Sequence, residues 1–82
     1  MIYFIQAGKN GPIKIGQSND PEVRLKNFQT GHYEELNLLF TITSDKLSDR
    51  DIHEILYEYR IRGEWFKPEV LNKIKLKDKL RL

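Results

Sequence analysis

The segment IYFIQAGKNGPIKIG, residues 2–16, decides the fold of this chain because it contains two short strands and the turn between them. Residues 2–6 and 13–16 are apolar runs rich in β-branched and aromatic residues, which favour strands. Between them, Asn10-Gly11 is a strong turn signal, and Gly16 ends the second run. We therefore predict an antiparallel hairpin, on which the rest of the domain is built.

The next segment predicts a helix that begins after Asp20. Asp20 is a good N-cap, Pro21 suits the first helical position, and Glu22 favours the positive end of the helix dipole. Gly31 is a natural C-terminal stop. Residues 36–43 are rich in strand formers again, so we expect a third strand there.

A second helix is predicted to begin at the cap Ser48 and to end at Gly63. Its apolar residues recur at the spacing of a core-facing stripe, namely Ile52, Ile55, Leu56 and Tyr59. The first helix has a shorter stripe, Leu25 and Phe28. Trp65 and Phe66 are interpreted as core anchors. A last short helix is expected after Pro68, with Val70, Leu71 and Ile74 facing inward.

The fold class that follows is α/β (α+β), with a small three-stranded antiparallel sheet flanked by two to three helices. At 82 residues the chain has room for one domain, assigned to residues 1–74. Residues 75–82 are assigned to a basic C-terminal tail. Lys or Arg alternates there with apolar residues, and this period of two predicts an edge strand or an extended arm.

The composition excludes several classes of protein. The chain has no cysteine, so disulfides and thiolate zinc sites are excluded, and a reducing, cytoplasmic location is expected. No apolar run approaches the roughly 20 residues that cross a bilayer, and no signal-like stretch leads the chain. The net charge of +2 is lower than that of a dedicated electrostatic DNA binder.

Several side chains have the chemistry needed to hydrolyse a phosphodiester. Glu64 can hold one hard divalent cation, Mg²⁺ or Mn²⁺, and Arg24 can grip the scissile phosphate with paired donors. Tyr3 can deprotonate or orient the attacking water if a nearby cation lowers its pKa. Lys14 is the candidate for that cation, and His53 is a second candidate for proton transfer.

Basic residues around Glu64 are the candidate contacts to a nucleic-acid backbone, namely Arg60, Arg62 and Lys67. Spacing predicts that His53, Tyr57 and Arg60 share one polar side of the second helix. Each candidate also has an ordinary structural explanation. Tyr3 can simply pack in its strand, Arg24 can be a surface charge, and Glu64 can pair with Arg60 or Arg62.

Taken in order, these features resemble the GIY-YIG nuclease superfamily, and most closely its compact branch named for a phage T5 open reading frame, also called the Mug113-like domain. The resemblance covers residues 1–71. It rests on Ile2-Tyr3-Phe4-Ile5, Ile13-Lys14-Ile15-Gly16, Arg24-Leu25, Gln29-Thr30-Gly31, Ile52-His53-Glu54, Tyr59-Arg60 and Arg62-Gly63-Glu64-Trp65-Phe66.

This resemblance implies a GIY-YIG-like fold and hydrolysis of DNA with a single metal ion. Tyr3 matches the tyrosine of the first half-motif, Arg24 the arginine of the first helix, and Glu64 the metal-binding glutamate. His53 matches a histidine common in this branch. Lys14 stands where the family name has a tyrosine, and the first half-motif lacks its glycine.

The expected activity is therefore that of a metal-dependent DNA endonuclease, with a homodimer or a partner protein supplying specificity. Two alternatives stay open at this point. One is a catalytically weak or inactive accessory module of a phage or mobile element, which binds DNA or a protein. The other is a protein-interaction domain that adds its basic tail to a sheet edge.

Overall fold

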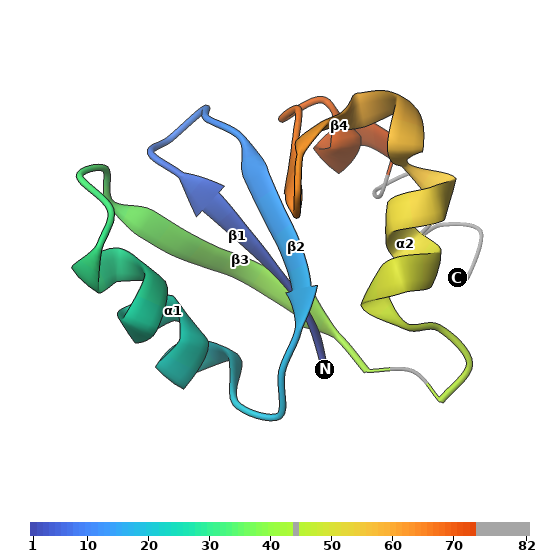
Figure 1. Ribbon diagram of the computed structural model, residues 1–82, viewed down its shortest axis with the longest axis horizontal. Helices are drawn as coiled ribbons and strands as arrows, with labels where there is room; N and C mark the ends of the chain where they lie inside the picture. The colour runs from blue at the N-terminus through green and yellow to red at the C-terminus, as the bar shows by residue number, and fades with distance from the viewer. Residues whose placement is uncertain (44, 74–82) are drawn as a thin grey trace.

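The N-terminal hairpin is the centre of the fold in the computed structural model, which describes residues 1–43 and 45–73 (Figure 1). Strand β1 (Ile2–Ala7) pairs antiparallel with β2 (Ile13–Gln17), and Tyr3 lies opposite Gly16. The connecting turn is closed by the Gly11 amide, which donates to the Ala7 carbonyl at 3.0 Å. The predicted hairpin is confirmed, although β2 continues past Gly16 by one residue.

The sheet has five antiparallel strands in the order β3-β1-β2-β5-β4. Strand β3 (Leu36–Ile42) is the predicted third strand, and it pairs with β1. The prediction of only three strands is wrong, because β4 (Arg60–Arg62) and β5 (Trp65–Phe66) form a second hairpin that extends the sheet beyond β2.

The reason for this difference lies where the second helix ends. Helix α2 (Asp49–Ile55) is followed by a single 3-10 turn, η1 (Tyr57–Tyr59), and the backbone is already extended at Arg60. Gly63 then adopts a φ of 56°, a left-handed conformation that a glycine accepts without strain. The expected alignment of His53 and Arg60 along one helix is therefore wrong.

The starts predicted for the first two helices are confirmed, and the short helix expected after Pro68 is present at residues 70–73. Helix α1 (Pro21–Thr30) is capped by the Asp20 carboxylate, which accepts a hydrogen bond from the Val23 amide at 3.3 Å. Ser48 caps α2 in a reciprocal capping box with Asp51. Ile55 does not face the core as its spacing predicted, because its side chain is 43% exposed.

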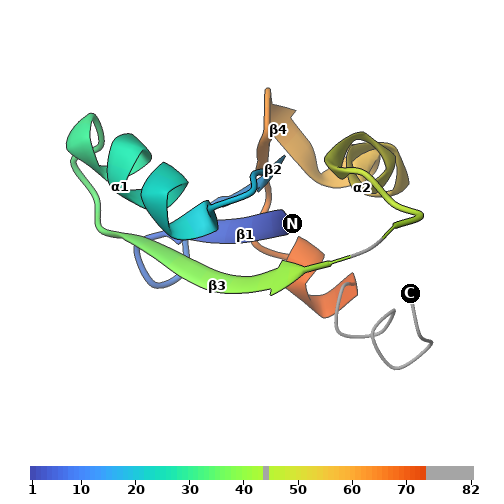
Figure 2. The ribbon, with the colours of Figure 1, turned by 90° about the horizontal axis from the view of Figure 1, so that it is seen from below.

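The sheet separates two hydrophobic clusters. On one face, side chains of α1 pack against the sheet, with Leu25 and Phe28 lying on Tyr3, Ile5, Ala7 and Leu36. On the other face, α2 and the helical residues 70–73 contribute to a cluster that contains Ile2, Phe4, Ile13, Ile15, Ile52, Leu56, Phe66 and Val70. Figure 2 shows α1 and residues 70–73 on opposite sides of the sheet. Strand β1 is buried along its whole length because both of its faces are covered.

The burial predicted for the apolar residues near the end of the domain is confirmed in part. Phe66 and Val70 are fully buried, whereas Trp65 is only partly buried. Ile74 and the tail of residues 75–82 lie outside the described residues, so the predicted edge strand and the division of the chain at residue 74 stay predictions. Within the described residues, no helix has the length and apolar character to cross a membrane.

The left-handed turn at Gly63 predicts a local stability effect. We expect Gly63→Ala to lower the free energy of unfolding by about 1 kcal/mol, because a Cβ disfavours positive φ. In a domain of this size that corresponds to a fall in the thermal midpoint of about 4–8 °C. Gly31→Ala is the matched control, since Gly31 has a φ of −102° and open space around its Cβ position. Equal midpoints for the two variants would contradict the strained turn.

Candidate active site

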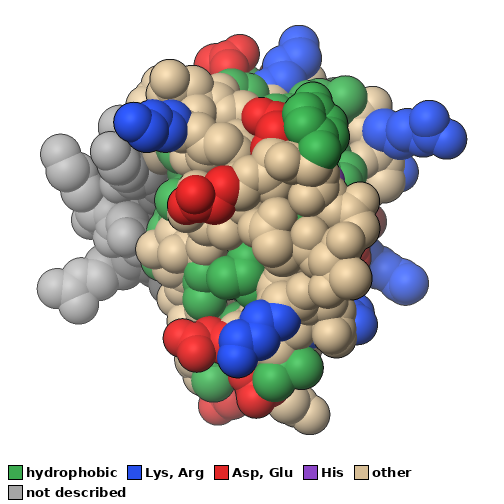
Figure 3. Space-filling view, turned by 90° about the vertical axis from the view of Figure 1, so that its left-hand side faces the viewer, with side chains coloured by type: hydrophobic (Ala, Val, Ile, Leu, Met, Phe, Trp, Pro, Cys, Tyr) green, Lys and Arg blue, Asp and Glu red, His purple; other side chains and the backbone are tan. Residues whose placement is uncertain are grey.

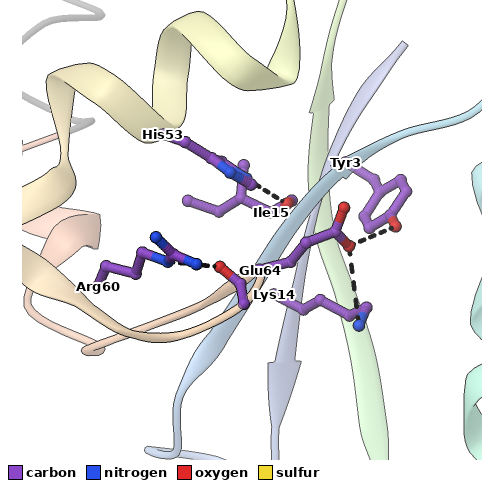
Figure 4. Close-up of polar contacts among 7 residues, drawn as sticks. Tyr3, Lys14, Ile15, His53, Arg60 and Glu64 are labelled. Atoms are coloured by element: carbon purple, nitrogen blue, oxygen red, sulfur yellow. Dashed lines mark hydrogen bonds and ion pairs between the residues drawn. The ribbon is translucent and has the colours of Figure 1, made fainter.

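Three predicted side chains meet at one carboxylate oxygen on the α1 face of the sheet. Tyr3 donates its hydroxyl hydrogen to Glu64 Oε1 at 3.5 Å, and Lys14 Nζ lies 3.7 Å from the same oxygen (Figure 4). Tyr3 and Lys14 come from paired strands, and Glu64 reaches them from the turn between β4 and β5. The second hairpin therefore brings together residues that are 61 positions apart in the chain.

Lys14 is held by aromatic rings as well as by Glu64. Its Nζ lies 4.4 Å from the ring centroid of Phe28 and 5.2 Å from that of Trp65. These distances allow cation–π attraction to both rings. The side chain is only 17% exposed, so its charge is oriented toward Glu64 rather than free in solvent.

Arg24 lies at the border of the same cluster. It is an exposed residue of α1, and its guanidinium carbon lies 5.5 Å from the ring centroid of Phe28. Phe28 is thus within cation–π distance of both Arg24 and Lys14. Figure 1 shows β2 running between α1 and α2, so the cluster is positioned by the sheet and by one flanking helix.

The surroundings of Tyr3 raise the pKa of its phenol to about 12. Burial is the main cause, because the residue is only 1% exposed, and the negative charge of Glu64 adds to it. The nearby positive charge of Arg24 acts in the opposite direction. A role for Tyr3 as a base, which the sequence suggested, would require a pKa below the ordinary value of a phenol. In the structure the phenol stays protonated at neutral pH and acts as a hydrogen-bond donor.

Gly16 belongs to this site, although in the sequence it is visible only as the end of a strand and as part of the second half-motif. A Cβ at Gly16 would overlap the Tyr3 hydroxyl and lie 3.0 Å from Glu64 Oε1. The phenol can reach the carboxylate only because this position has no side chain. A glycine inside a strand often marks such a close approach, so this signal was available in the sequence.

His53 joins the site through the backbone of β2. Its Nε2 lies 2.7 Å from the Ile15 carbonyl oxygen, which can only accept, so Nε2 carries the proton. The Ile15 amide donates to the Glu64 carbonyl at 2.9 Å. The carbonyl of Ile15 therefore holds the His53 side chain beside β2, and its amide holds the backbone of Glu64 there. The role of His53 in proton transfer stays a prediction.

The three candidate nucleic-acid contacts lie on or near the second hairpin. Arg60 Nε donates to the Gly63 carbonyl at 2.9 Å and so braces the turn that carries Glu64 (Figure 4). Arg62 and Lys67 are exposed. Figure 3 shows basic and acidic side chains interspersed on the side that carries α1. That side therefore presents no broad basic surface.

The possible metal ligands of this site fit an ion that takes one carboxylate from the protein and its other ligands from water and substrate. Among residues 1–43 and 45–73, no group of three or more His, Cys, Asp or Glu side chains gathers that could hold an ion. Glu64 offers a single carboxylate, and its side chain is 39% exposed. Mg²⁺ is commonly bound by one or two carboxylates with waters and substrate phosphates. Glu64 is compatible with an ion of that kind, completed by substrate.

Comparison with protein-family models matches residues 1–81 to the T5orf172 domain. The chain belongs to the T5orf172 domain family. This family is nuclease-like and related to the GIY-YIG nucleases, so the superfamily predicted from the sequence is confirmed at that level. No curated protein and no solved structure matched the chain. In this T5orf172 domain, Tyr3, Lys14 and Glu64 are in direct contact, Arg24 borders them, and His53 is attached to the same strand.

The close approach at Gly16 can be tested by a double-mutant cycle. We expect Gly16→Ala to lower the free energy of unfolding by about 1–3 kcal/mol, because the new methyl group overpacks against Tyr3. Measured by chemical denaturation, the same change should cost less in a Tyr3→Phe background, where the hydroxyl is absent. Strict additivity of the two changes would show that the hydroxyl and Gly16 are not in contact.

The raised pKa of Tyr3 predicts a late step in an alkaline titration. The phenol should ionise at about pH 12 in the folded protein, so Tyr3→Phe should remove the most alkaline tyrosinate absorbance. Because its ordinary pKa is 10.0, the unfolded chain loses this proton first. Stability contributed by Tyr3 should therefore be present below pH 10 and decline toward pH 12. A Tyr3 step near or below pH 10 would contradict the buried environment.

Proposed function

We propose that this T5orf172 domain is a DNA endonuclease that hydrolyses phosphodiester bonds with one divalent cation, Mg²⁺ or Mn²⁺, at Glu64. The observation that supports this most strongly is the convergence of Tyr3, Lys14 and Glu64 at one oxygen, with Arg24 beside them. Family membership supports a nuclease-like chemistry. Assignment to the Mug113-like branch is part of this proposal.

Each side chain has a task that follows from its position. Arg24, exposed at the border of the cluster, binds the scissile phosphate with its paired donors. Lys14 adds positive charge over the phosphate and helps position water. Tyr3, a donor at neutral pH, orients the Glu64 carboxylate and the water rather than removing a proton. Glu64 would hold the divalent cation, which when bound would supply stabilisation of charge on the phosphate and the leaving oxygen.

In the overall reaction the water oxygen bonds to phosphorus and the bond from phosphorus to the leaving sugar oxygen breaks. The water loses one proton and the leaving oxygen gains one, so the products are a phosphate monoester and a hydroxyl, with His53 as the candidate for this proton transfer. A chain with a single active site cuts one strand at a time. A double-strand break then needs two copies of the chain or two visits, which is the reason to propose a homodimer or a partner protein. A cytoplasmic role in a phage or mobile element belongs to the same proposal.

A second candidate function is an accessory module that binds DNA or a protein partner with little or no cleavage. Two observations favour it. The ion pair between Lys14 and Glu64 occupies the proposed metal ligand with a competing cation. The mixed charge on the α1 side and the net charge of +2 give little electrostatic attraction to DNA, which favours the form of this function that binds a protein partner.

Plasmid cleavage in Mg²⁺ or Mn²⁺ distinguishes the two functions. We expect Glu64→Gln to lower the cleavage rate at least about 100-fold, because the isosteric amide loses the charge that holds the cation. Glu54→Gln is the matched control, since Glu54 is an exposed carboxylate on α2. The natural chain, Glu54→Gln and Glu64→Gln should bind DNA alike. DNA binding without cleavage by the natural chain would instead support the accessory module.

A further inference from the structure

Three aromatic rings form a row that leads from the surface to the candidate active site. The rings of His32 and Tyr33 are stacked, with centroids 5.6 Å apart and an interplanar angle of 3°. His32 is also 5.9 Å from Trp65, at 32°. The Trp65 ring in turn contacts Lys14 Nζ, at 5.2 Å. The row therefore ends at the cluster that contains Glu64.

Tyr33, at the outer end of this row, is an aromatic residue that is almost fully exposed and so has no role in the core. Tyr33 is 95% exposed, so apart from its offset stacking with His32 the ring is open to solvent. It lies in the loop between α1 and β3. Burying an aromatic ring is favourable, so a ring held in solvent is available to a ligand that can cover it.

The loop that carries Tyr33 is organised by hydrogen bonds from a side chain on α1. Gln29 Nε2 donates to the carbonyls of His32, at 3.3 Å, and Glu34, at 2.8 Å. Gln29 Oε1 accepts from the Leu36 amide at 2.7 Å. His32 Nδ1 accepts from the Glu34 amide at 3.2 Å. The loop backbone on both sides of Tyr33 and the His32 ring are thus held by hydrogen bonds, which lowers the entropy cost of stacking on this loop.

The two ends of the aromatic row differ in charge, and the Tyr33 end favours a neutral ligand group over a phosphate. Two acidic residues, Glu34 and Glu35, directly follow Tyr33 in the chain, so this loop carries negative charge, which disfavours an anion at this end. Lys14 lies at the other end and would attract one. A nucleotide strand matches this arrangement when its bases lie on the rings and its phosphate reaches Lys14. Bases inside a continuous duplex expose their edges, whereas unpaired bases expose the faces that stack.

We propose that Tyr33, His32 and Trp65 form a stacking platform for unpaired bases of a DNA strand whose phosphate lies at Lys14 and Glu64. The inference rests on the proposed function and specifies its substrate class. The preferred substrate is DNA with a single-stranded segment, such as a frayed end or a branch, rather than continuous duplex. Stacking does not depend on base identity, so little sequence preference is expected from this surface.

The test compares binding of a labelled single-stranded oligodeoxynucleotide with binding of the same sequence as duplex, by fluorescence anisotropy in EDTA. We expect Tyr33→Ala to weaken single-strand binding about 5- to 150-fold, the range for loss of one base–aromatic stack. Duplex binding should change little, and Tyr33→Phe should keep the natural affinity. Tyr57→Ala is the control, because Tyr57 is 68% exposed on η1. Circular dichroism verifies that each variant is folded.

A second measurement reports stacking directly. A 2-aminopurine placed in the single strand should be quenched on binding to the natural chain and to Tyr33→Phe, but less by Tyr33→Ala. Unchanged single-strand affinity and quenching in Tyr33→Ala would overturn the platform, as would equal weakening of single-strand and duplex binding. A natural chain that binds no oligonucleotide would also overturn it.

These outcomes are separable from those of the proposed nuclease activity. Glu64→Gln should lose cleavage yet keep the dependence of single-strand binding on Tyr33. If the natural chain cuts DNA through Glu64 but Tyr33→Ala binds normally, the platform fails and the nuclease stands. If no cleavage occurs but single-strand binding depends on Tyr33, the nuclease fails and the platform stands.

Discussion

The pairing of the second hairpin with β2 is the constraint on which the candidate site depends. Only two residues of β5 pair with β2, and the Ile15 amide then continues the contact by donating to the Glu64 carbonyl. This short ladder sets the position of the Glu64 side chain above Tyr3 and Lys14. Arg60 and Gly63 shape the turn, but the backbone of β2 determines where the turn lies. The site is therefore a property of sheet register rather than of any one motif.

Local signals predicted the elements that depend on neighbouring residues. The hairpin turn, the Asp20 cap of α1 and the Ser48 cap of α2 all act within a few positions, and the structure has each of them. The second hairpin could not be predicted in this way. Residues 60–62 directly follow the apolar stripe of the second helix, and strands of three and two residues are too short to show a period. Tertiary pairing overrides the local preference there.

For the candidate site, the sequence indicated which residues take part but not the direction in which the pKa of Tyr3 is shifted. Tyr3, Lys14 and Glu64 were candidates, and the structure brings them together. The direction of the Tyr3 pKa depends on burial and on a carboxylate far away in the sequence, so no local pattern could reveal it. Gly16 was visible in the sequence as a glycine at the end of an apolar run. Its importance follows only from the structure, where the Tyr3 phenol fills the space that a side chain at position 16 would need.

The separation of Tyr3 and Glu64 by 61 positions also has a consequence for biosynthesis. The phenol, the amine of Lys14 and α1 are all translated before the carboxylate that completes the cluster. A contact between such distant residues forms only after a large loop has closed, which makes it a late event in folding. A nascent chain that ends before β5 therefore has no assembled site. The order of synthesis itself keeps the carboxylate from its partners until almost the entire described domain has left the ribosome.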